Sequence, residues 1–137
     1  MARASELLGD RWTLLILREA FYGVARFEDV RADIGAPRAA LSQRLSKLVR
    51  EKIMAKSAYR DPGDRQRFEY QLTEKGRALA YVLIALMEWG DKFLRDDPAP
   101  LELRDAKSGK PLRIALVAPD GKPCPLTDVR QVLRGKV

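Results

Sequence analysis

Histidine is absent from this chain of 137 residues, and cysteine occurs once, at Cys124. Without histidine, serine and cysteine nucleophiles lack their usual base, and a metal ion lacks its commonest ligand. One cysteine can neither close an internal disulfide nor hold a zinc ion by itself. The sequence also has no glycine-rich phosphate loop and no carboxylate pair framed by apolar residues. We therefore expect neither an enzyme nor a bound metal or cofactor.

Long apolar segments are missing as well. The longest unbroken one, Ala78 to Met87, is too short to cross a bilayer and has the length of a buried helix. No apolar leader segment follows the N-terminus. These features, with the single cysteine, predict a cytoplasmic protein that does not span a membrane. With 46% hydrophobic residues, the chain can bury one ordinary core and carry an appendage.

Acidic residues are scarce between residues 36 and 60, in a chain whose formal net charge is +7. Glu51 is the one carboxylate in this stretch, whereas residues 73–97 mix both signs of charge. A positive field that is concentrated on one part of the fold favours a polyanionic partner. The cations of the stretch are Arg38, Arg44, Lys47, Arg50, Lys52, Lys56 and Arg60.

Residues 38–52 have the pattern of an amphipathic helix. At about 100° per residue, three leucines fall on one side of this helix, and polar hydrogen-bonding groups fall on the other. Such a helix is anchored by one face and offers its donors on the opposite face, as a DNA-reading helix does. The leucines are Leu41, Leu45 and Leu48, and the opposing residues are Gln43, Ser46, Lys47 and Arg50.

The residues before this helix predict a helix-turn-helix. Phe27, Val30 and Ile34 recur at i, i+3 and i+7, a spacing that buries one side of a short helix. Gly35 favours a break after that helix, and Pro37 suits the first turn of the next one, where its missing N–H would have no partner. Two short helices around a tight turn make a helix-turn-helix.

The residues after the amphipathic helix predict a β-hairpin. Two β-prone stretches, residues 53–60 and 66–72, flank a Pro-Gly turn at 61–64. Helix, helix-turn-helix and hairpin follow one another in the order of a winged helix, whose hairpin, the wing, meets a phosphate backbone. A solvated hairpin tip is the alternative. The wing cations are Arg60, Arg65 and Arg67.

A long helix is expected from Thr73, its N-cap, to about Leu94. Its central stretch is apolar on every side, and a small domain cannot cover all sides of a terminal helix. A second copy of the chain is one cover, and the tail from Pro100 onward is the other. We predict a homodimer whose interface includes Tyr81, Val82, Ile84, Ala85 and Trp89.

A proline-bearing linker at residues 96–100 ends this helix. We therefore divide the chain into a winged-helix and dimerisation domain at residues 1–97 and an extension at residues 98–137. Short apolar stretches separated by a Pro-Asp-Gly turn predict that the extension is a small β-rich unit.

One further helix is expected to begin at Asp10, a suitable N-cap, and to end near Gly23. Its Trp12, with Tyr81 and Trp89, allows two interpretations. These aromatic residues line a pocket for a small-molecule effector, or they are ordinary core and interface residues, as aromatic residues at helical spacing usually are. We assign no ligand.

Five blocks of the sequence together resemble the HxlR-type winged helix-turn-helix regulators. They occur in the family's order and spacing and cover residues 5–95, and their combination is specific although each is weak alone. The blocks are LGDRWTLLILRE at 8–19, RF at 26–27, LSQRL at 41–45, YQLTEKG at 70–76 and EWG at 88–90.

The resemblance implies a mixed α+β fold that is mainly helical, with a β-hairpin wing and a small β-rich C-terminal appendage. It implies a bacterial, cytoplasmic transcription regulator related to the MarR group, which binds a pseudo-palindromic operator in double-stranded DNA as a homodimer. Some thiol-sensing members have a cysteine just ahead of the first helix, and residues 1–6 have none. Thiol sensing at that position is therefore unsupported, and any small-molecule effector is unidentified.

In this resemblance the recognition helix lies in the major groove. Gln43 suits adenine, Lys47 suits guanine or a phosphate, and Arg38 in the first turn suits a phosphate. An interaction module that had lost DNA binding would have a depleted basic face, whereas this helix keeps its cations. The predicted DNA-contacting residues of the helix are Arg38, Ser42, Gln43, Arg44, Ser46, Lys47 and Arg50.

Overall fold

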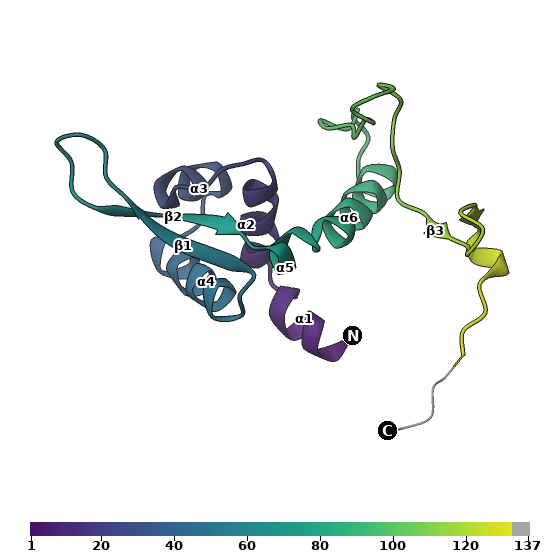
Figure 1. Cartoon of the computed structure of the whole chain (residues 1–137), viewed down its shortest axis with the longest axis horizontal. Coiled ribbons are helices and arrows are strands. Elements are labelled where there is room, and N and C mark those ends of the chain that lie inside the picture. Colours follow the sequence, from purple (N-terminus) through teal and green to yellow (C-terminus); the bar gives the residue numbers. More distant parts are fainter. Residues whose placement is uncertain (133–137) are drawn as a thin grey trace. The chain divides into compact units, whose positions relative to one another are not determined.

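The computed structural model describes residues 1–132 (Figure 1). The chain packs as two compact units, residues 1–83 and residues from 84 onward, and each is described by itself. The elements of the first unit are α1 (Ala2–Leu8), α2 (Arg11–Phe21), α3 (Phe27–Ile34), α4 (Arg38–Arg50), β1 (Met54–Tyr59), β2 (Arg67–Leu72) and α5 (Glu74–Arg77). Helix α6 (Ala80–Phe93) begins in the first unit and ends in the second, which also holds β3 (Leu116–Val117), β4 (Pro123–Cys124) and a 3-10 turn (Leu126–Asp128).

Helix α2 begins where the sequence predicts. The side chain of Asp10 accepts a hydrogen bond from the backbone N–H of Thr13 at 3.1 Å, which satisfies one of the free N–H groups of the first turn. Helix α1 was not predicted. It is a short helix without a side-chain cap, and only Leu7 and Leu8 at its end pack against the core, so it has no repeating apolar pattern.

The predicted turn between α3 and α4 is confirmed. Gly35 ends α3 in the left-handed conformation, with φ 66° and ψ 26°, which glycine adopts without a Cβ clash. Pro37 stands at the N-cap of α4 with φ −58°. The expected end of α4 at Lys52 is wrong by two residues, because the helix ends at Arg50 and Lys52 has a left-handed φ of 58°.

One apolar core lies between α2, α3, α4 and the start of β1. The three leucines of α4 are 0–1% exposed, and they pack with Ile16 and Leu17 of α2. Burying each leucine stabilises the fold by about 1.5–3 kcal/mol. The predicted anchoring face of α4 is therefore confirmed. The remaining core residues are Val30, Ile34, Ala36, Ile53 and Met54.

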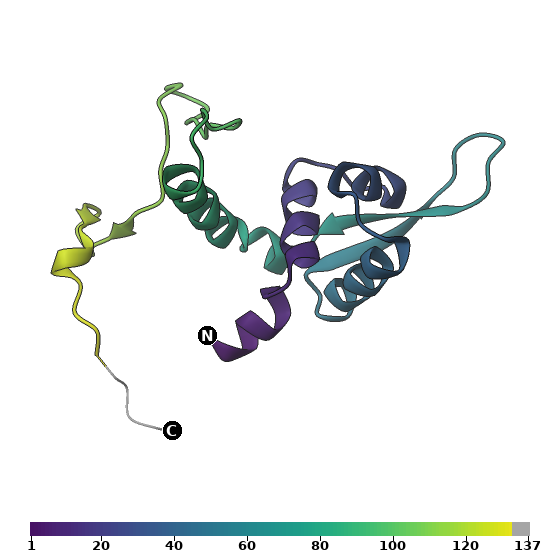
Figure 2. The same cartoon turned by 180° about the vertical axis from the view of Figure 1, so that it is seen from behind.

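The hairpin of β1 and β2 is antiparallel, with Met54 paired to Leu72 and Tyr59 to Arg67. α3 contacts β2 and α4 contacts β1, as the view from behind also shows (Figure 2). The turn of the hairpin, at residues 61–64, is closed by a hydrogen bond from the Asp64 N–H to the Asp61 carbonyl oxygen at 3.0 Å. Gly63 follows a proline and has φ 80°, which makes this a type II turn.

The long helix expected from Thr73 to Leu94 is interrupted, so this part of the prediction is wrong. Thr73 does cap the helix, accepting from the Gly76 N–H at 3.1 Å, but α5 ends at Arg77 and α6 begins at Ala80. Leu79, in the interruption, packs against the core. The sequence pattern does not mark this break. The break accompanies a tertiary contact, the packing of Leu79 against the core, which a local pattern does not show.

The second unit has little regular structure after α6. A reverse turn brings Arg104 and Pro111 into an isolated antiparallel bridge, and β3 pairs with β4 over two residues each. Short antiparallel pairs therefore occur in the predicted β-rich extension. Residues 133–137 of that extension lie outside the described residues.

Gly76 is the glycine whose substitution tests this packing. It is buried, and a Cβ on it would lie 2.2 Å from the backbone oxygen of Ile53. Because backbone must shift to admit that methyl group, Gly76→Ala is expected to lower the free energy of unfolding by about 1–3 kcal/mol, measured by denaturant titration.

The matched control is Gly90→Ala in α6, where a Cβ would meet no heavy atom within 4 Å. Alanine favours the helix over glycine, so this variant is expected to gain up to about 1 kcal/mol. Equal stability of Gly76→Ala and the native chain would contradict the close approach.

Candidate nucleic-acid interface

The face of α4 opposite the core is exposed and polar. Ser42, Gln43, Ser46 and Arg50 are exposed, so the predicted sidedness of the helix is confirmed. Within residues 1–132, Arg50 forms no salt bridge. Hydroxyl, amide and guanidinium groups are those that read base edges and phosphates in a groove, and here they lie along one side of a rigid element.

Arg44 is tied to the start of α2. Its Nε donates to Oδ1 of Asp10 at 2.9 Å, and both side chains are about one-third exposed. Burial raises the pKa of Asp10, but hydrogen bonds from Thr13 and Arg44 outweigh this effect and leave the pKa below its usual value. The carboxylate is therefore charged when the two helices are packed at neutral pH.

Two further cations of α4 also have partners within the chain. Nζ of Lys47 donates to the backbone oxygen of Glu6 in α1 at 2.9 Å. The Arg38 guanidinium pairs with Glu28 and lies 5.1 Å from the centre of the Phe27 ring. The hydrogen bond and charge of Arg38 lower the pKa of Glu28. Both lysine and arginine side chains are long enough to exchange such surface partners for a phosphate.

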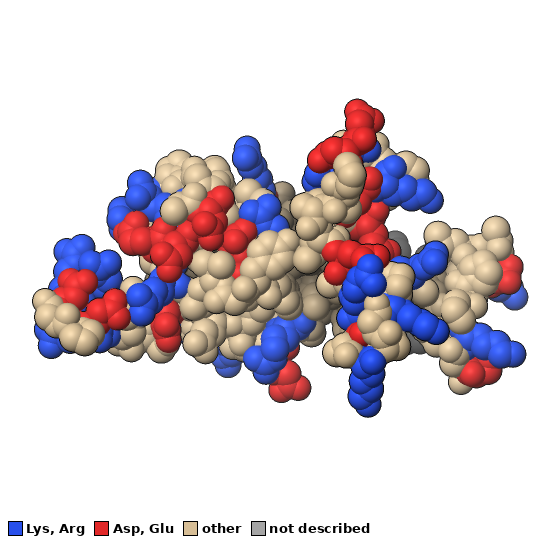
Figure 3. All heavy atoms as spheres, turned by 90° about the horizontal axis from the view of Figure 1, so that it is seen from above, with Lys and Arg blue, Asp and Glu red and all other residues tan. Residues whose placement is uncertain are grey.

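The three predicted wing cations lie at the hairpin turn, and two are organised by Asp64. Nε of Arg60 donates to the Asp64 backbone oxygen at 2.8 Å, and Arg67 pairs with its carboxylate at 2.9 Å. Arg65 is exposed. Figure 3, seen from the α3 side, shows basic and acidic side chains together at the hairpin tip and acidic side chains gathered over α3. The acidic residues of α3 are Glu28, Asp29 and Asp33.

Arg26 holds the wing to the helical part of the first unit. Its two terminal nitrogens donate to Asp61 at 3.3 and 3.2 Å, and its guanidinium lies 4.3 Å from the centre of the Tyr59 ring. The Tyr70 N–H also donates to the Ala25 oxygen at 2.8 Å. This contact of Arg26 could not be predicted from the sequence, because its partner is 35 positions away and neither residue carries a motif for it.

Helix α6 presents an exposed apolar stripe. Val82, Leu86, Trp89 and Phe93 are 42%, 48%, 55% and 60% exposed, and with Ala85 they recur at i, i+3, i+4, i+7 and i+11. Tyr81 is exposed at the edge of the stripe, and Ile84 is half-buried. The Trp89 and Phe93 rings are 5.8 Å apart. The stripe, defined as Val82, Ala85, Leu86, Trp89 and Phe93, is of the kind that usually marks an interface.

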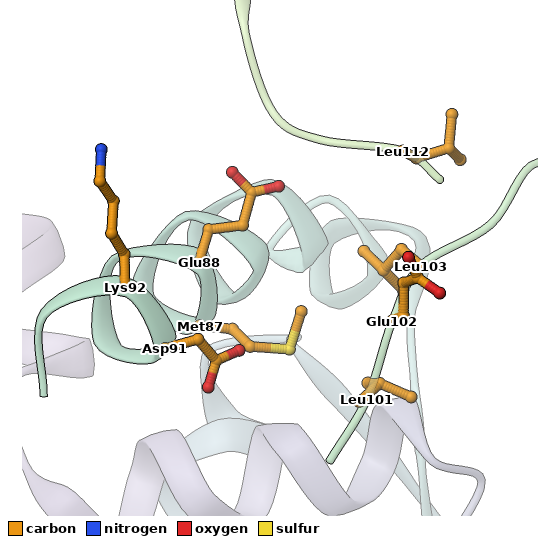
Figure 4. A pocket seen from close by; sticks show the side chains of 8 residues that line it. All are labelled: Met87, Glu88, Asp91, Lys92, Leu101, Glu102, Leu103 and Leu112. Atoms are coloured by element: carbon orange, nitrogen blue, oxygen red, sulfur yellow. The ribbon is translucent and has the colours of Figure 1, made fainter. Parts of the chain in front are cut away.

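The second unit has an open pocket of about 350 Å³ (Figure 4). One of its carboxylates, Glu88, accepts a hydrogen bond from the Ile114 N–H at 2.8 Å and so holds the tail backbone. Trp12, for which the sequence allowed either a pocket or a core role, packs against the core of the first unit. The lining residues are Met87, Glu88, Asp91, Lys92, Leu101, Glu102, Leu103 and Leu112.

A helix-turn-helix followed by a hairpin, with polar donors on the outer face of the second helix, defines a winged-helix DNA-binding domain. Residues 7–98 match the family described as HxlR-like helix-turn-helix. The chain belongs to the HxlR-like helix-turn-helix family, and it is a transcriptional regulator with a helix-turn-helix domain. The family is one of regulators rather than enzymes. No helix among residues 1–132 has the length and apolar character needed to cross a membrane.

Relatives and solved structures agree with this assignment. An uncharacterized HTH-type transcriptional regulator of Mycobacterium tuberculosis, Rv3095, is 46% identical over 111 residues, which is 80% of this chain and 69% of that protein. The crystal structure of PA1607, assigned as a transcription factor, has 34% identity and a TM-score of 0.79, covering 96% of this chain and 92% of the other. The reduced form of the regulator YodB from B. subtilis has 31% identity and a TM-score of 0.59, covering 71% and 94%.

The role of Arg26 can be tested without DNA. Arg26→Leu removes the contacts to Asp61 and Tyr59, which together stabilise the wing by about 1 kcal/mol. We expect about fivefold faster hydrogen exchange at the Asp64 amide, measured by NMR, because its partner Asp61 is freed.

The control is Arg65→Ala, since the side chain of Arg65 forms no salt bridge with any residue in 1–132. It should leave exchange at the Asp64 amide unchanged. Unchanged exchange in Arg26→Leu would show that the wing is held by the strand pairing alone.

Proposed function

We propose that the chain binds a pseudo-palindromic operator as a homodimer, with α4 in the major groove and the wing on the flanking backbone, in the cytoplasm of a bacterium. The observation that carries this proposal is the division of α4, whose three leucines are fully buried while Ser42, Gln43 and Ser46 are exposed. A helix held so firmly on one side can present its other side to base edges with little adjustment.

Base readout falls to the residues at the centre of the exposed face. The amide of Gln43 can donate to N7 and accept from N6 of adenine, and Ser42 and Ser46 can bond to any base edge within reach. Ala39 is exposed near the start of the helix, where a short side chain permits close approach to a thymine methyl group.

Backbone contacts fall to the cations around this centre. Arg50 is free of salt bridges in the described chain, whereas Arg38 and Lys47 would exchange a glutamate and a carbonyl oxygen for phosphates. Arg44 flanks the groove. The wing adds Arg60, Arg65 and Arg67, which would contact phosphates beyond the groove that α4 occupies.

Dimerisation is proposed through the stripe of α6, with Tyr81 and Ile84 beside it. The stripe exposes two aromatic rings to water, and burying them against a second copy would recover the hydrophobic free energy that the isolated chain lacks. A twofold dimer repeats the same patch on both partners and so matches a palindromic site. The two α4 helices would then lie about 34–36 Å apart, one turn of DNA.

The two kinds of contact predict different losses. Arg50→Ala should weaken binding to every duplex alike and lower the salt slope of log K by about one, because one phosphate contact is lost. Gln43→Ala should weaken binding only to the duplex that the native chain selects from a random library, by about 1–3 kcal/mol. Fluorescence anisotropy at several salt concentrations measures both effects.

Lys110→Ala is the control, since it removes one exposed charge from the second unit without touching α4 or the wing. It should change neither the slope nor the preference. If the native chain bound all duplexes equally and Gln43→Ala changed nothing, sequence-specific regulation would be the wrong function, and an interaction module would replace it.

Dimerisation is tested separately by sedimentation at micromolar concentration. Trp89→Glu places a charge in the centre of the stripe, and burying an unpaired charge is costly, so we expect a monomer with reduced DNA affinity. Asp91→Ala, on the opposite side of α6, is the matched control and should remain a dimer. A native chain that sediments as a monomer would remove this part of the proposal.

A further inference from the structure

Asp10 uses both carboxylate oxygens, and it joins two helices. Oδ1 accepts from the Thr13 N–H at 3.1 Å and from Nε of Arg44 at 2.9 Å, while Oδ2 accepts from the Thr13 hydroxyl at 2.5 Å. The two bonds from Thr13 belong to the start of α2. The bond from Arg44 reaches the middle of α4, 34 positions further along the chain. One side chain therefore caps α2 and holds a side chain of the recognition helix.

Arg44 also contacts a residue on the exposed side of α4. Its Nη1 donates to Oε1 of Gln43 at 3.4 Å. A guanidinium has donors fixed in one plane, so its orientation toward Asp10 also sets the direction of the donor that Gln43 accepts. The start of α2, Arg44 and the exposed amide of Gln43 thus form one continuous series of hydrogen bonds.

The hydrogen bond between Arg44 and Asp10 gives α4 a directional constraint, which its apolar core contacts do not. The buried leucines hold the helix by apolar packing, which is non-directional and resists rotation about the helix axis only through side-chain shape. A charge-assisted hydrogen bond is directional and roughly twice as strong as a neutral one. The second bond to the N-terminal region, from Lys47 to the Glu6 oxygen, lies one turn further along α4.

We propose that Asp10 is a positioning residue for sequence recognition, which acts through Arg44 to set the rotation of α4 and the orientation of Gln43. The inference rests on the proposed function and deepens it. It assigns Arg44 a task within the protein in place of a phosphate contact, and it gives an acidic side chain a favourable part in binding a polyanion.

The sign of the effect separates this role from simple electrostatics. Asp10 is a negative charge beside a surface that meets DNA, so charge alone predicts tighter binding when it is removed. Positioning predicts weaker binding to the selected sequence. A phosphate contact by Arg44 predicts a third pattern, in which loss of the arginine lowers the salt slope and leaves sequence preference intact.

Asp10→Ser isolates the positioning role from the cap. Serine is as good an N-cap as aspartate, so it can still accept from the Thr13 N–H, but it is too short to reach Arg44. Asp10→Asn is the matched control, because it removes the same charge and keeps both the cap and an oxygen for Arg44. Arg44→Gln removes the other partner and leaves the cap of α2 intact.

The experiment measures affinity for two duplexes, the one that the native chain selects from a random library and an unrelated one. Asp10→Ser is expected to lose about tenfold for the selected duplex with an unchanged salt slope, since a charge-assisted bond is lost. Asp10→Asn should stay within about threefold of the native chain, because a neutral hydrogen bond remains. Affinity for the unrelated duplex should stay equal or rise slightly in both.

Arg44→Gln should show the same loss of preference, and the double variant with Asp10→Ser should lose no more than either single variant, because both remove one interaction. Asp10→Ser binding the selected duplex as tightly as the native chain, or Arg44→Gln lowering only the salt slope, would overturn the inference while the proposed function stands. If the native chain selects no sequence from the library, both the inference and the proposed function are wrong. If Asp10→Ser does not fold, the result for Arg44→Gln alone tests the inference.

Discussion

The burial of three leucines on one side of α4 is the constraint on which the rest of the first unit depends. Leu41, Leu45 and Leu48 are covered by α2, α3 and the start of β1, and this packing fixes which residues of α4 can meet a partner. The left-handed Gly35 ends α3 just before α4 begins, and three residues separate the end of α4 from the start of the hairpin. The polar face, the turn and the wing are therefore consequences of one packing arrangement.

The cations of α4 differ in whether they have a partner within the chain. Of the cations on α4, Arg38, Arg44 and Lys47 have partners on α3, at the start of α2 and on α1, and Arg50 has no ion partner among residues 1–132. A basic stretch thus holds side chains of two kinds, those that have a partner within the chain and those that have no ion partner among the described residues. A count of charges along the sequence cannot separate the two, because the separation depends on carboxylates and carbonyl oxygens that the fold brings close.

Local signals in the sequence were enough for the main elements. The Gly-Ala-Pro turn, the cap at Asp10 and the alternation in the hairpin each act within a few residues, so the helix-turn-helix and wing could be predicted from them. The features that were missed depend on distant contacts. Helix α1 has no pattern of its own, the break before α6 accompanies the packing of Leu79, and the bonds from Arg26 and Arg44 join residues more than 30 positions apart. The sidedness of α4 followed from periodicity, whereas the partners of its cations did not.

The opposite faces of α4 have a consequence for how such a regulator can diverge. Because Ser42, Gln43 and Ser46 make no contribution to the buried core, they can be exchanged with little loss of fold stability, and under the proposed function single substitutions there would give access to new operators. Arg44 does not share this freedom, because its hydrogen bond to Asp10 joins α4 to the start of α2. Evolution of specificity in this scaffold would therefore proceed around a fixed arginine, with its neighbours varying and its aspartate retained.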